Sequence, residues 1–201
     1  MNRLFPLFFK LNGRRCLVVG AGKIGESKIA SLLNTGAELH VVAPQATDRV
    51  KMWARNGQLR WSKRKFREAD LSGRFLVIAA TSSRKLHERI FRLAQRQKIM
   101  CNVVDVPELC DFYYPAVVQR GALQIAVSTG GESPALAQRL RKELESEFGP
   151  EYEQWLAQLG KERVKIRAGE APGPELNKRL HLMASKAAFQ KFLRRRKRRR
   201  D

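Results

Sequence analysis

A glycine-rich loop near the N-terminus has the spacing of a nucleotide-binding turn. An apolar run at 16–19 passes into Gly-Ala-Gly-Lys-Ile-Gly at 20–25, and a helical pattern ended by Gly36 follows. In a G-x-G-x-x-G loop the first glycine permits a tight turn, the second lets the backbone approach a pyrophosphate, and the third lets the helix pack closely on the sheet. The free N–H groups at the helix N-terminus can then receive phosphates. A plain strand-to-helix turn is the alternative, so the prediction of a dinucleotide site depends on the flanking strand and helix.

One carboxylate, Asp105, stands directly after an apolar run at 100–104. Open α/β sheets bind their ligands at the carboxyl ends of the strands, which is where this residue is expected. A carboxylate placed there can take the proton that a substrate loses when a hydride leaves it. The alternative is that Asp105 only caps the turn before Pro107. Asp105 is therefore the candidate catalytic base.

A second polar loop runs from Ser128 through Thr129 and Gly130 to Gly131, ahead of a helix that begins near Ser133. Several N–H groups and hydroxyls would converge in such a loop, which suits carboxylates or phosphates. Ordinary helix capping is the alternative, and for Ser133 it is the preferred interpretation.

Histidines and cysteines form no recognisable ligand set. His40, His87 and His181 are scattered without partners at useful spacing, so structural or solvated roles are expected. The three cysteines show no C-x-x-C spacing, so the sequence indicates neither a disulfide framework nor a zinc site. Cys16 and Cys101 lie in strand-like runs and are expected in the core of a protein from a reducing compartment.

Strands and helices alternate up to residue 104, which predicts an α/β fold with a Rossmann-type, doubly wound parallel sheet. The expected elements are strands at 5–11 and 16–19, a helix at 23–34, a strand at 38–42, a helix at 48–55, strands at 59–61 and 75–80, a helix at 85–95 and a strand at 100–104. The strand at 38–42 ends at Ala43-Pro44-Gln45, where the adenosine ribose of a dinucleotide would lie. No Asp or Glu stands there, so the glycine loop alone does not select NAD over NADP.

The pattern changes after residue 111 to a β-hairpin and then helices. The expected elements are strands at 112–119 and 122–128, a helix from 134 to about 148, an amphipathic segment at 151–167, a linker at 168–174 and one helix at 175–193. The predicted domains are a Rossmann domain at 1–111, a small α+β segment at 112–148, a helical region at 149–193 and a basic, frayed tail at 194–201.

The chain is strongly basic, with a formal net charge of +21 over 201 residues. From Lys191 onward, eight basic residues and one acid contribute +7, which leaves +14 on the rest. An anionic partner is expected: nucleic acid, an anionic membrane surface or a polyanionic small molecule. No run approaches the roughly 20 apolar residues that span a bilayer, and no small-residue cleavage site follows the apolar stretch at 4–11, so a cytoplasmic protein is expected.

Five stretches carry a family resemblance: 19–28, 41–44, 79–83, 102–107 together with Phe112 and Pro115-Ala116, and 125–137. In this order they resemble the precorrin-2 dehydrogenase and sirohydrochlorin ferrochelatase family, the siroheme-synthase module that acts on tetrapyrroles. The resemblance covers residues 4 to 148. It implies an NAD-dependent oxidation of precorrin-2 to sirohydrochlorin, and it leaves open whether ferrous iron is then inserted to give siroheme.

The resemblance also implies roles for particular residues. Asp105 is similar to the family's essential carboxylate. The cofactor-binding residues would be Gly20, Gly22, Lys23, Ile24 and Gly25 in the loop, Pro44 and Gln45 at the adenosine end, and Thr81 beside the cofactor. The residues that face the tetrapyrrole would be Ser128, Thr129 and Gly130. Family members resemble one another as homodimers, in which the segment that corresponds to 112–148 exchanges contacts between subunits. The resemblance identifies no metal-binding residues.

Precorrin-2 is a polycarboxylate, so a basic cleft would attract it and raise its local concentration. Two features depart from the family: Ser82-Ser83 replaces an acidic or amide pair, and the arginine-rich tail at 194–200 is not shared. That tail could serve solubility or contact an anionic membrane surface or nucleic acid, and it motivates the competing hypothesis of a Rossmann-type regulatory or nucleic-acid-binding protein without turnover.

Overall fold

The structure, a computed structural model, describes residues 4–169 and 173–198. The chain divides into two compact units, Met1–Tyr113 and Tyr114–Asp201. Among the described residues no helix is both long and apolar enough to cross a bilayer.

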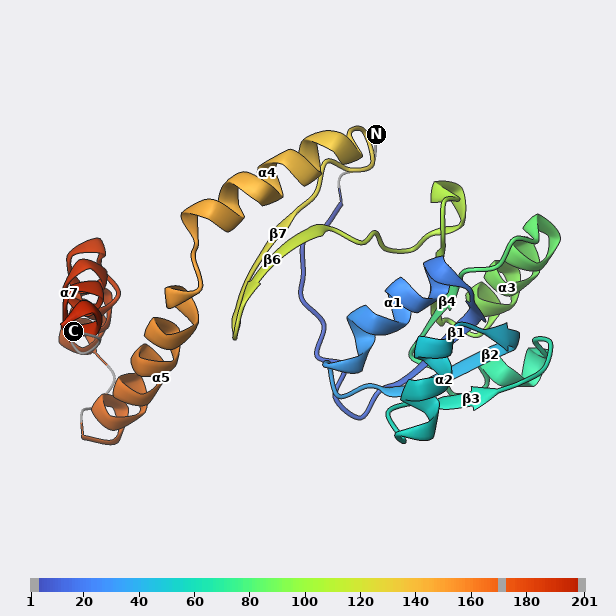
Figure 1. Cartoon of the computed structure of the whole chain (residues 1–201), viewed down its shortest axis with the longest axis horizontal. Coiled ribbons are helices and arrows are strands. Elements are labelled where there is room, and N and C mark those ends of the chain that lie inside the picture. The colour runs from blue at the N-terminus through green and yellow to red at the C-terminus, as the bar shows by residue number, and fades with distance from the viewer. Residues whose placement is uncertain (1–3, 170–172, 199–201) are drawn as a thin grey trace. The chain divides into compact units, whose positions relative to one another are not determined.

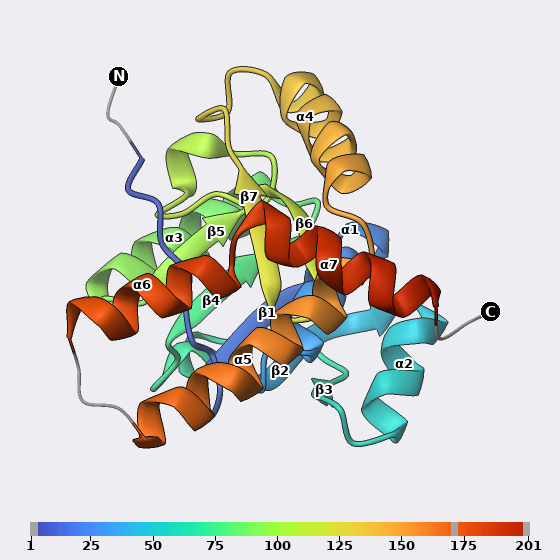
Figure 2. The same ribbon diagram turned by 90° about the vertical axis from the view of Figure 1, so that its left-hand side faces the viewer.

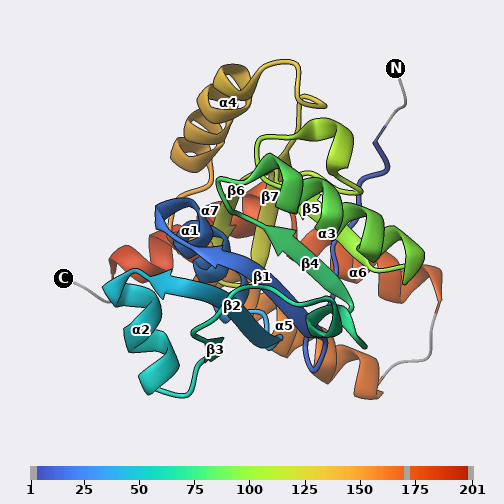
Figure 3. The same cartoon turned by 90° about the vertical axis from the view of Figure 1, so that its right-hand side faces the viewer.

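A five-stranded parallel sheet forms the centre of the first unit, in the order β3-β2-β1-β4-β5 (Figure 1, Figure 3). Its strands are β1 (Arg15–Ala21), β2 (Glu38–Ala46), β3 (Arg60–Ser62), β4 (Leu76–Ala79) and β5 (Met100–Val103). The central strands are almost uninterrupted apolar runs because both faces of a parallel sheet are covered. Leu17, Val18, Val77 and Ile78 are fully buried, and each such side chain stabilises the fold by about 1.5–3 kcal/mol. The predicted Rossmann-type sheet is confirmed.

Helices cover both faces of this sheet. The chain runs from β1 outward to β3 and then returns to β4 and β5 on the other side of β1. Right-handed crossovers therefore place α1 (Lys23–Leu33) and α2 (Asp48–Arg55) on one face and α3 (Arg84–Arg96) on the other (Figure 1). The strand order reverses between β1 and β4, and the carboxyl ends of the strands at such a reversal are the usual ligand position in these sheets.

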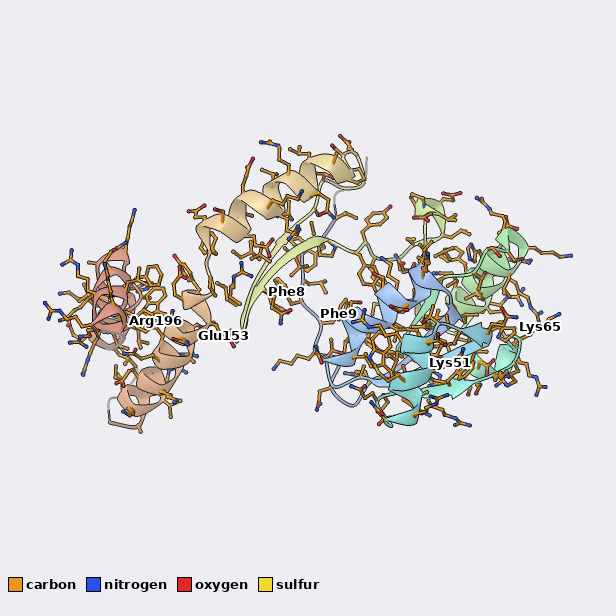
Figure 4. All side chains as sticks on the ribbon, in the orientation of Figure 1. Phe8, Phe9, Lys51, Lys65, Glu153 and Arg196 are labelled. Carbon is orange, nitrogen blue, oxygen red and sulfur yellow. The ribbon has the colours of Figure 1, made fainter. Side chains whose placement is uncertain are left out.

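Two expectations for the first unit are wrong. Residues 5–11 form no strand but an extended segment with largely exposed apolar side chains, including Phe8 and Phe9 (Figure 4). Pro6 lacks an N–H, and no neighbouring strand pairs with this segment within the described part of the unit. The second strand continues through Pro44 and Gln45 to Ala46, because a bulge between Val19 and Ala21 lets β1 and β2 pair again beyond the expected end.

A network of polar side chains lies between β2, β3 and the start of β4. Asp70 accepts two hydrogen bonds from the Arg64 guanidinium, at 2.6 and 2.8 Å, and one from the Arg67 N–H. Arg74 donates to the Asp70 carbonyl and to His40 Nδ1, the latter at 2.7 Å. The other ring nitrogen of His40, Nε2, therefore carries the proton and donates to the Ser62 hydroxyl at 2.9 Å. This network holds His40 in its neutral form.

Stability should fall when the pH drops below about 6.5. Burial, followed by the Arg74 charge, lowers the pKa of His40 below its ordinary 6.5, and burial also lowers the pKa of His87. The folded protein then binds fewer protons than the unfolded chain, so this stability is complete above the unfolded pKa and is lost as the pH falls toward the folded pKa. Thermal unfolding at about pH 7.5 and 5.5 should show a Tm lower by several degrees at the acidic pH. His40→Gln should reduce the difference, whereas a similar reduction in the exposed control His181→Gln would contradict the assignment.

The second unit begins with a β-hairpin followed by helices. Strands β6 (Ala116–Arg120) and β7 (Leu123–Val127) pair antiparallel, and Gly121 turns with a φ of 58°. The helices are α4 (Pro134–Glu147), α5 (Glu151–Gly169), α6 (Pro174–Met183) and α7 (Lys186–Lys197), as Figure 2 shows. The predicted hairpin is confirmed.

The single helix expected at 175–193 is wrong. The chain forms α6 and α7 instead, separated at Ala184 and Ser185. The Ser185 hydroxyl accepts a hydrogen bond from the Ala188 N–H and so begins a new helix. The expectation of a tail frayed from residue 194 is also wrong, since α7 continues to Lys197; the last tail residues, 199–201, lie outside the described residues.

Candidate active site

Two glycines let the end of β1 and the first turn of α1 pack against each other and against the residue that follows β4. Gly20 has a φ of +102°, and a Cβ atom there would lie 2.2 Å from the Ala80 carbonyl oxygen. A Cβ atom on Gly25 would lie 2.3 Å from the Gly20 carbonyl oxygen. Any side chain at either position would force backbone apart. These glycines therefore have the packing roles that their spacing predicts.

Gly22 differs from the other two glycines because it borders open space. It is the N-cap of α1 with ordinary extended dihedral angles, and a Cβ atom there would meet nothing within 4 Å. No side chain caps this helix. Its first N–H groups precede the first intrahelical hydrogen bond, in which the Glu26 N–H donates to the Gly22 carbonyl at 2.8 Å. The helix N-terminus thus offers N–H donors and a positive dipole end beside an open cradle that fits a pyrophosphate.

The remaining cofactor residues predicted in this unit lie at or near the same edge. Lys23 and Ile24 are exposed in the first turn of α1, and the Ile24 side chain is 53% exposed although it is apolar. Pro44 and Gln45 are exposed at the end of β2. The Thr47 N–H donates to the Ala21 carbonyl at 3.0 Å, which ties the end of β2 to the glycine loop.

Thr81 follows β4 and contacts the loop closely. Its Cγ2 atom would be 3.2 Å from a Cβ atom on Gly20. The Thr81 N–H donates to Nε2 of the buried His87 at 3.2 Å. His87 is therefore structural, one of the two roles expected for it, and it fixes the start of the segment after β4.

Asp105 lies in the turn after β5, at the same edge of the sheet. Its φ of +60° is in the left-handed region, which is uncommon for residues other than glycine, asparagine and aspartate. The Val104 N–H donates to the Ala79 carbonyl at 3.0 Å, and the Cys110 thiol donates to the carbonyls of Val103 and Val106. These bonds hold the turn, and the Asp105 carboxylate is exposed.

Lys28 on α1 is a neighbour of Asp105 that the sequence analysis did not single out. Burial lowers the pKa of its ammonium group, and the charges of Asp105 and then Cys110 partly oppose this shift. Lys28 is half-buried on the second turn of α1. The place of Lys28 within the 19–28 stretch was the sequence signal that could have indicated a role. Only the order of the strands shows that α1 lies near the turn after β5.

Ser128, Thr129 and Gly130 lie in the loop between β7 and α4, in the second unit. The Ser128 hydroxyl oxygen accepts from the Gly130 N–H, and the Thr129 hydroxyl oxygen accepts from the Ser133 N–H, both at 3.2 Å. Ser133 caps α4 by accepting from the Leu136 N–H, as expected. The loop is therefore organised by its own bonds, and each hydroxyl retains an O–H donor for a carboxylate.

The described residues contain no group of three or more His, Cys, Asp or Glu side chains that could hold a metal ion. Burial raises the pKa of the Cys16 thiol to about 11 and that of Cys101 to about 12. Both thiols are buried in the core, as expected, and stay protonated at neutral pH.

Two family models match this chain in order. Residues 7–116 match the family described as "Putative NAD(P)-binding", and residues 120–147 match the central part of a sirohaem biosynthesis protein. The chain belongs to the siroheme synthase N-terminal module family. The sequence-based resemblance is thereby confirmed, and the first unit of this siroheme synthase module is an NAD(P)-binding domain.

Similar proteins match the module over most of its length. A siroheme synthase of Xylella fastidiosa is 37% identical over 194 residues, which are 96% of this chain and 40% of that protein. A siroheme synthase of Nitrosococcus oceani is 40% identical over 141 residues, 70% of this chain and 30% of that protein. The module thus spans well under half the length of these curated relatives. Among solved structures, SirC, a precorrin-2 dehydrogenase, is 28% identical with a TM-score of 0.75, covering 96% of this chain and 98% of SirC.

Proposed function

We propose that this chain oxidises precorrin-2 to sirohydrochlorin with NAD as hydride acceptor and Asp105 as general base. The observation that carries the proposal is the position of Asp105 and the Gly20–Gly25 loop at the carboxyl edge of one parallel sheet. The likeness to SirC and to the siroheme synthases supports the choice of substrate.

Different residues at this edge would bind the cofactor and take the proton. NAD, when bound, accepts the hydride. Gly22 leaves room for the pyrophosphate, and the N–H groups of Lys23, Ile24 and Gly25 are suited to hold it. The substrate loses two hydrogens, one as hydride and one as a proton, and the Asp105 carboxylate takes the proton. The ammonium of Lys28 lies near enough to the Asp105 carboxylate for the two charges to attract each other, which places a cation beside the proposed base.

Turnover of precorrin-2 tests the proposal directly. The purified chain, incubated anaerobically with precorrin-2 and either NAD or NADP, should form one reduced cofactor for each sirohydrochlorin. NAD should give the larger kcat/KM, although β2 ends in Ala43, Pro44 and Gln45 without a carboxylate for the ribose. Absence of turnover with both cofactors would refute the proposed activity, whereas a preference for NADP would correct only the cofactor.

We propose further that the protein acts as a homodimer. Most apolar side chains of the N-terminal segment are exposed, including Phe5 at 83% and Phe8 at 67%, and Val117 on β6 is 39% exposed. The hairpin β6–β7 packs on α4 and α5 and still leaves Val117 exposed, so apolar surface remains for a partner subunit to cover. A sedimentation mass of one chain at micromolar concentration would contradict the dimer.

A further inference from the structure

A groove among the last three helices of the second unit has the dimensions of a small-molecule site. Residues of α5, α6 and α7 border a groove of about 540 Å³, within the range of about 300–1,000 Å³ that ligand pockets occupy. Figure 2 shows these three helices side by side. None of the residues assigned above to the reaction lines this groove.

One wall of the groove is apolar and aromatic. Trp155 and Leu159 on α5, Met183 on α6 and Phe192 on α7 line it. The Trp155 ring contacts Phe189 with ring centroids 4.7 Å apart, which fixes the indole in place. Binding of a planar ligand is favoured when its apolar face covers side chains of this kind.

The positive charge of the groove comes mainly from α7. Lys191, Arg195 and Arg196 line the groove, and Figure 4 shows Arg196 on this helix. Arg179 of α6 adds a fourth cation to the lining. The one carboxylate among the lining residues, Glu162, accepts a hydrogen bond from Lys165 at 3.3 Å. Lys191, Arg195 and Arg196 therefore outnumber the one carboxylate of the lining, which favours an occupant with several negative charges.

We propose that this groove is a second binding site, for an aromatic polycarboxylate of the tetrapyrrole class. The aromatic wall suits a rigid macrocycle, and the guanidinium groups of Arg195 and Arg196 can form bidentate hydrogen bonds with peripheral carboxylates. A groove of this volume, bordered by three short helices, fits one compact ligand better than the extended backbone of a nucleic acid, which needs a longer cationic stripe. The choice of tetrapyrroles among aromatic polycarboxylates rests on the proposed function. The preference for an aromatic polycarboxylate follows from the charge and shape of the groove and is independent of that function.

Fluorescence of Trp155 tests the site without turnover or cofactor. Trp53 and Trp61, the other two tryptophans, lie in the first unit. Titration of the full chain with uroporphyrin, a stable octacarboxylated porphyrin, should quench the emission saturably. The Trp155→Phe variant should lose most of this quenching. Equal quenching in Trp155→Phe would place the porphyrin elsewhere and overturn the proposal. Because no NAD is present, the result is independent of whether the chain oxidises precorrin-2.

A matched pair of double variants separates the groove from general charge attraction. Arg195→Gln with Arg196→Gln removes two lining cations, and Arg194→Gln with Lys197→Gln removes two cations of the same helix that do not line the groove. Calorimetric titration with uroporphyrin should show a Kd at least about tenfold larger for the first pair and changed less than about threefold for the second. Equal weakening by both pairs, or none by either, would overturn the site. Displacement of uroporphyrin by a single-stranded oligonucleotide at equal concentration would instead identify a nucleic-acid surface.

Discussion

The Gly22→Asp variant should bind NAD and NADP at least about 100-fold more weakly than the parent chain and unfold at the same or a slightly higher temperature. The stability follows from the open space around Gly22, its ordinary backbone angles and its place as an N-cap, where aspartate is among the preferred residues. The loss of binding follows from charge. A carboxylate about 4 Å from a phosphate is repelled by about 4 kcal/mol at an effective dielectric constant of 20, and it also occupies the N–H donors that the phosphate needs.

Calorimetric titration with each dinucleotide and thermal unfolding without ligand measure the two effects. Gly173→Asp is the matched control, because Gly173 is the N-cap of α6, also lacks a side-chain cap and also borders open space. It should leave dinucleotide binding unchanged. If Gly22→Asp bound NAD as tightly as the parent chain, the loop would not be the phosphate cradle. If the variant instead lost several degrees of Tm, the space around Gly22 would not be open.

The dinucleotide loop could be predicted from sequence because all its determinants are local. The apolar run of β1, the three glycines and the helical pattern of α1 follow one another directly, and each residue's conformational need can be judged from its type. The extension of β2 to Ala46 could not be predicted in this way. It depends on a bulge opposite Gly20, which only the pairing of β1 with β2 shows.

Features that depend on distant parts of the chain were the ones missed. Lys28 meets Asp105 because β5 lies beyond β4 on the side of β1 away from β2, and no pattern near either residue encodes that order. The apolar residues at 5–11 have strand-like composition, yet a strand also needs a neighbour with which to pair. The break between α6 and α7 is different, since Ser185 within the helical pattern is a local cap signal from which two helices could have been predicted.

The Asp105→Asn variant should reduce kcat for precorrin-2 oxidation by about 10²–10⁴-fold, the usual contribution of a general base. Its Kd for NAD should change less than about twofold, because the glycine loop is untouched. Asparagine has nearly the same shape as aspartate and tolerates the left-handed conformation that residue 105 adopts. The fold should therefore persist, so a loss of turnover would report the loss of the carboxylate.

Glu108→Gln is the control for a general change of charge at this edge. Glu108 lies three residues after Asp105, is exposed and pairs with Arg84 at 2.9 Å. Its loss should leave kcat within about threefold of the parent value. If both variants lost turnover equally, the local field rather than Asp105 would be responsible, and full activity of Asp105→Asn would exclude Asp105 as the base.

The interaction between Asp105 and Lys28 can be tested by a measurement other than activity. The Asp105 charge opposes the lowering of the Lys28 pKa by burial. Removing that charge in Asp105→Asn should therefore lower the pKa of Lys28 further, because the ammonium form loses an attractive partner. Titration of the Lys28 side chain by NMR measures the shift, and Glu108→Gln should not produce it. An unchanged Lys28 titration in Asp105→Asn would mean that the two groups do not face each other, and the proposed pairing of Lys28 with Asp105 would be withdrawn even if turnover were lost.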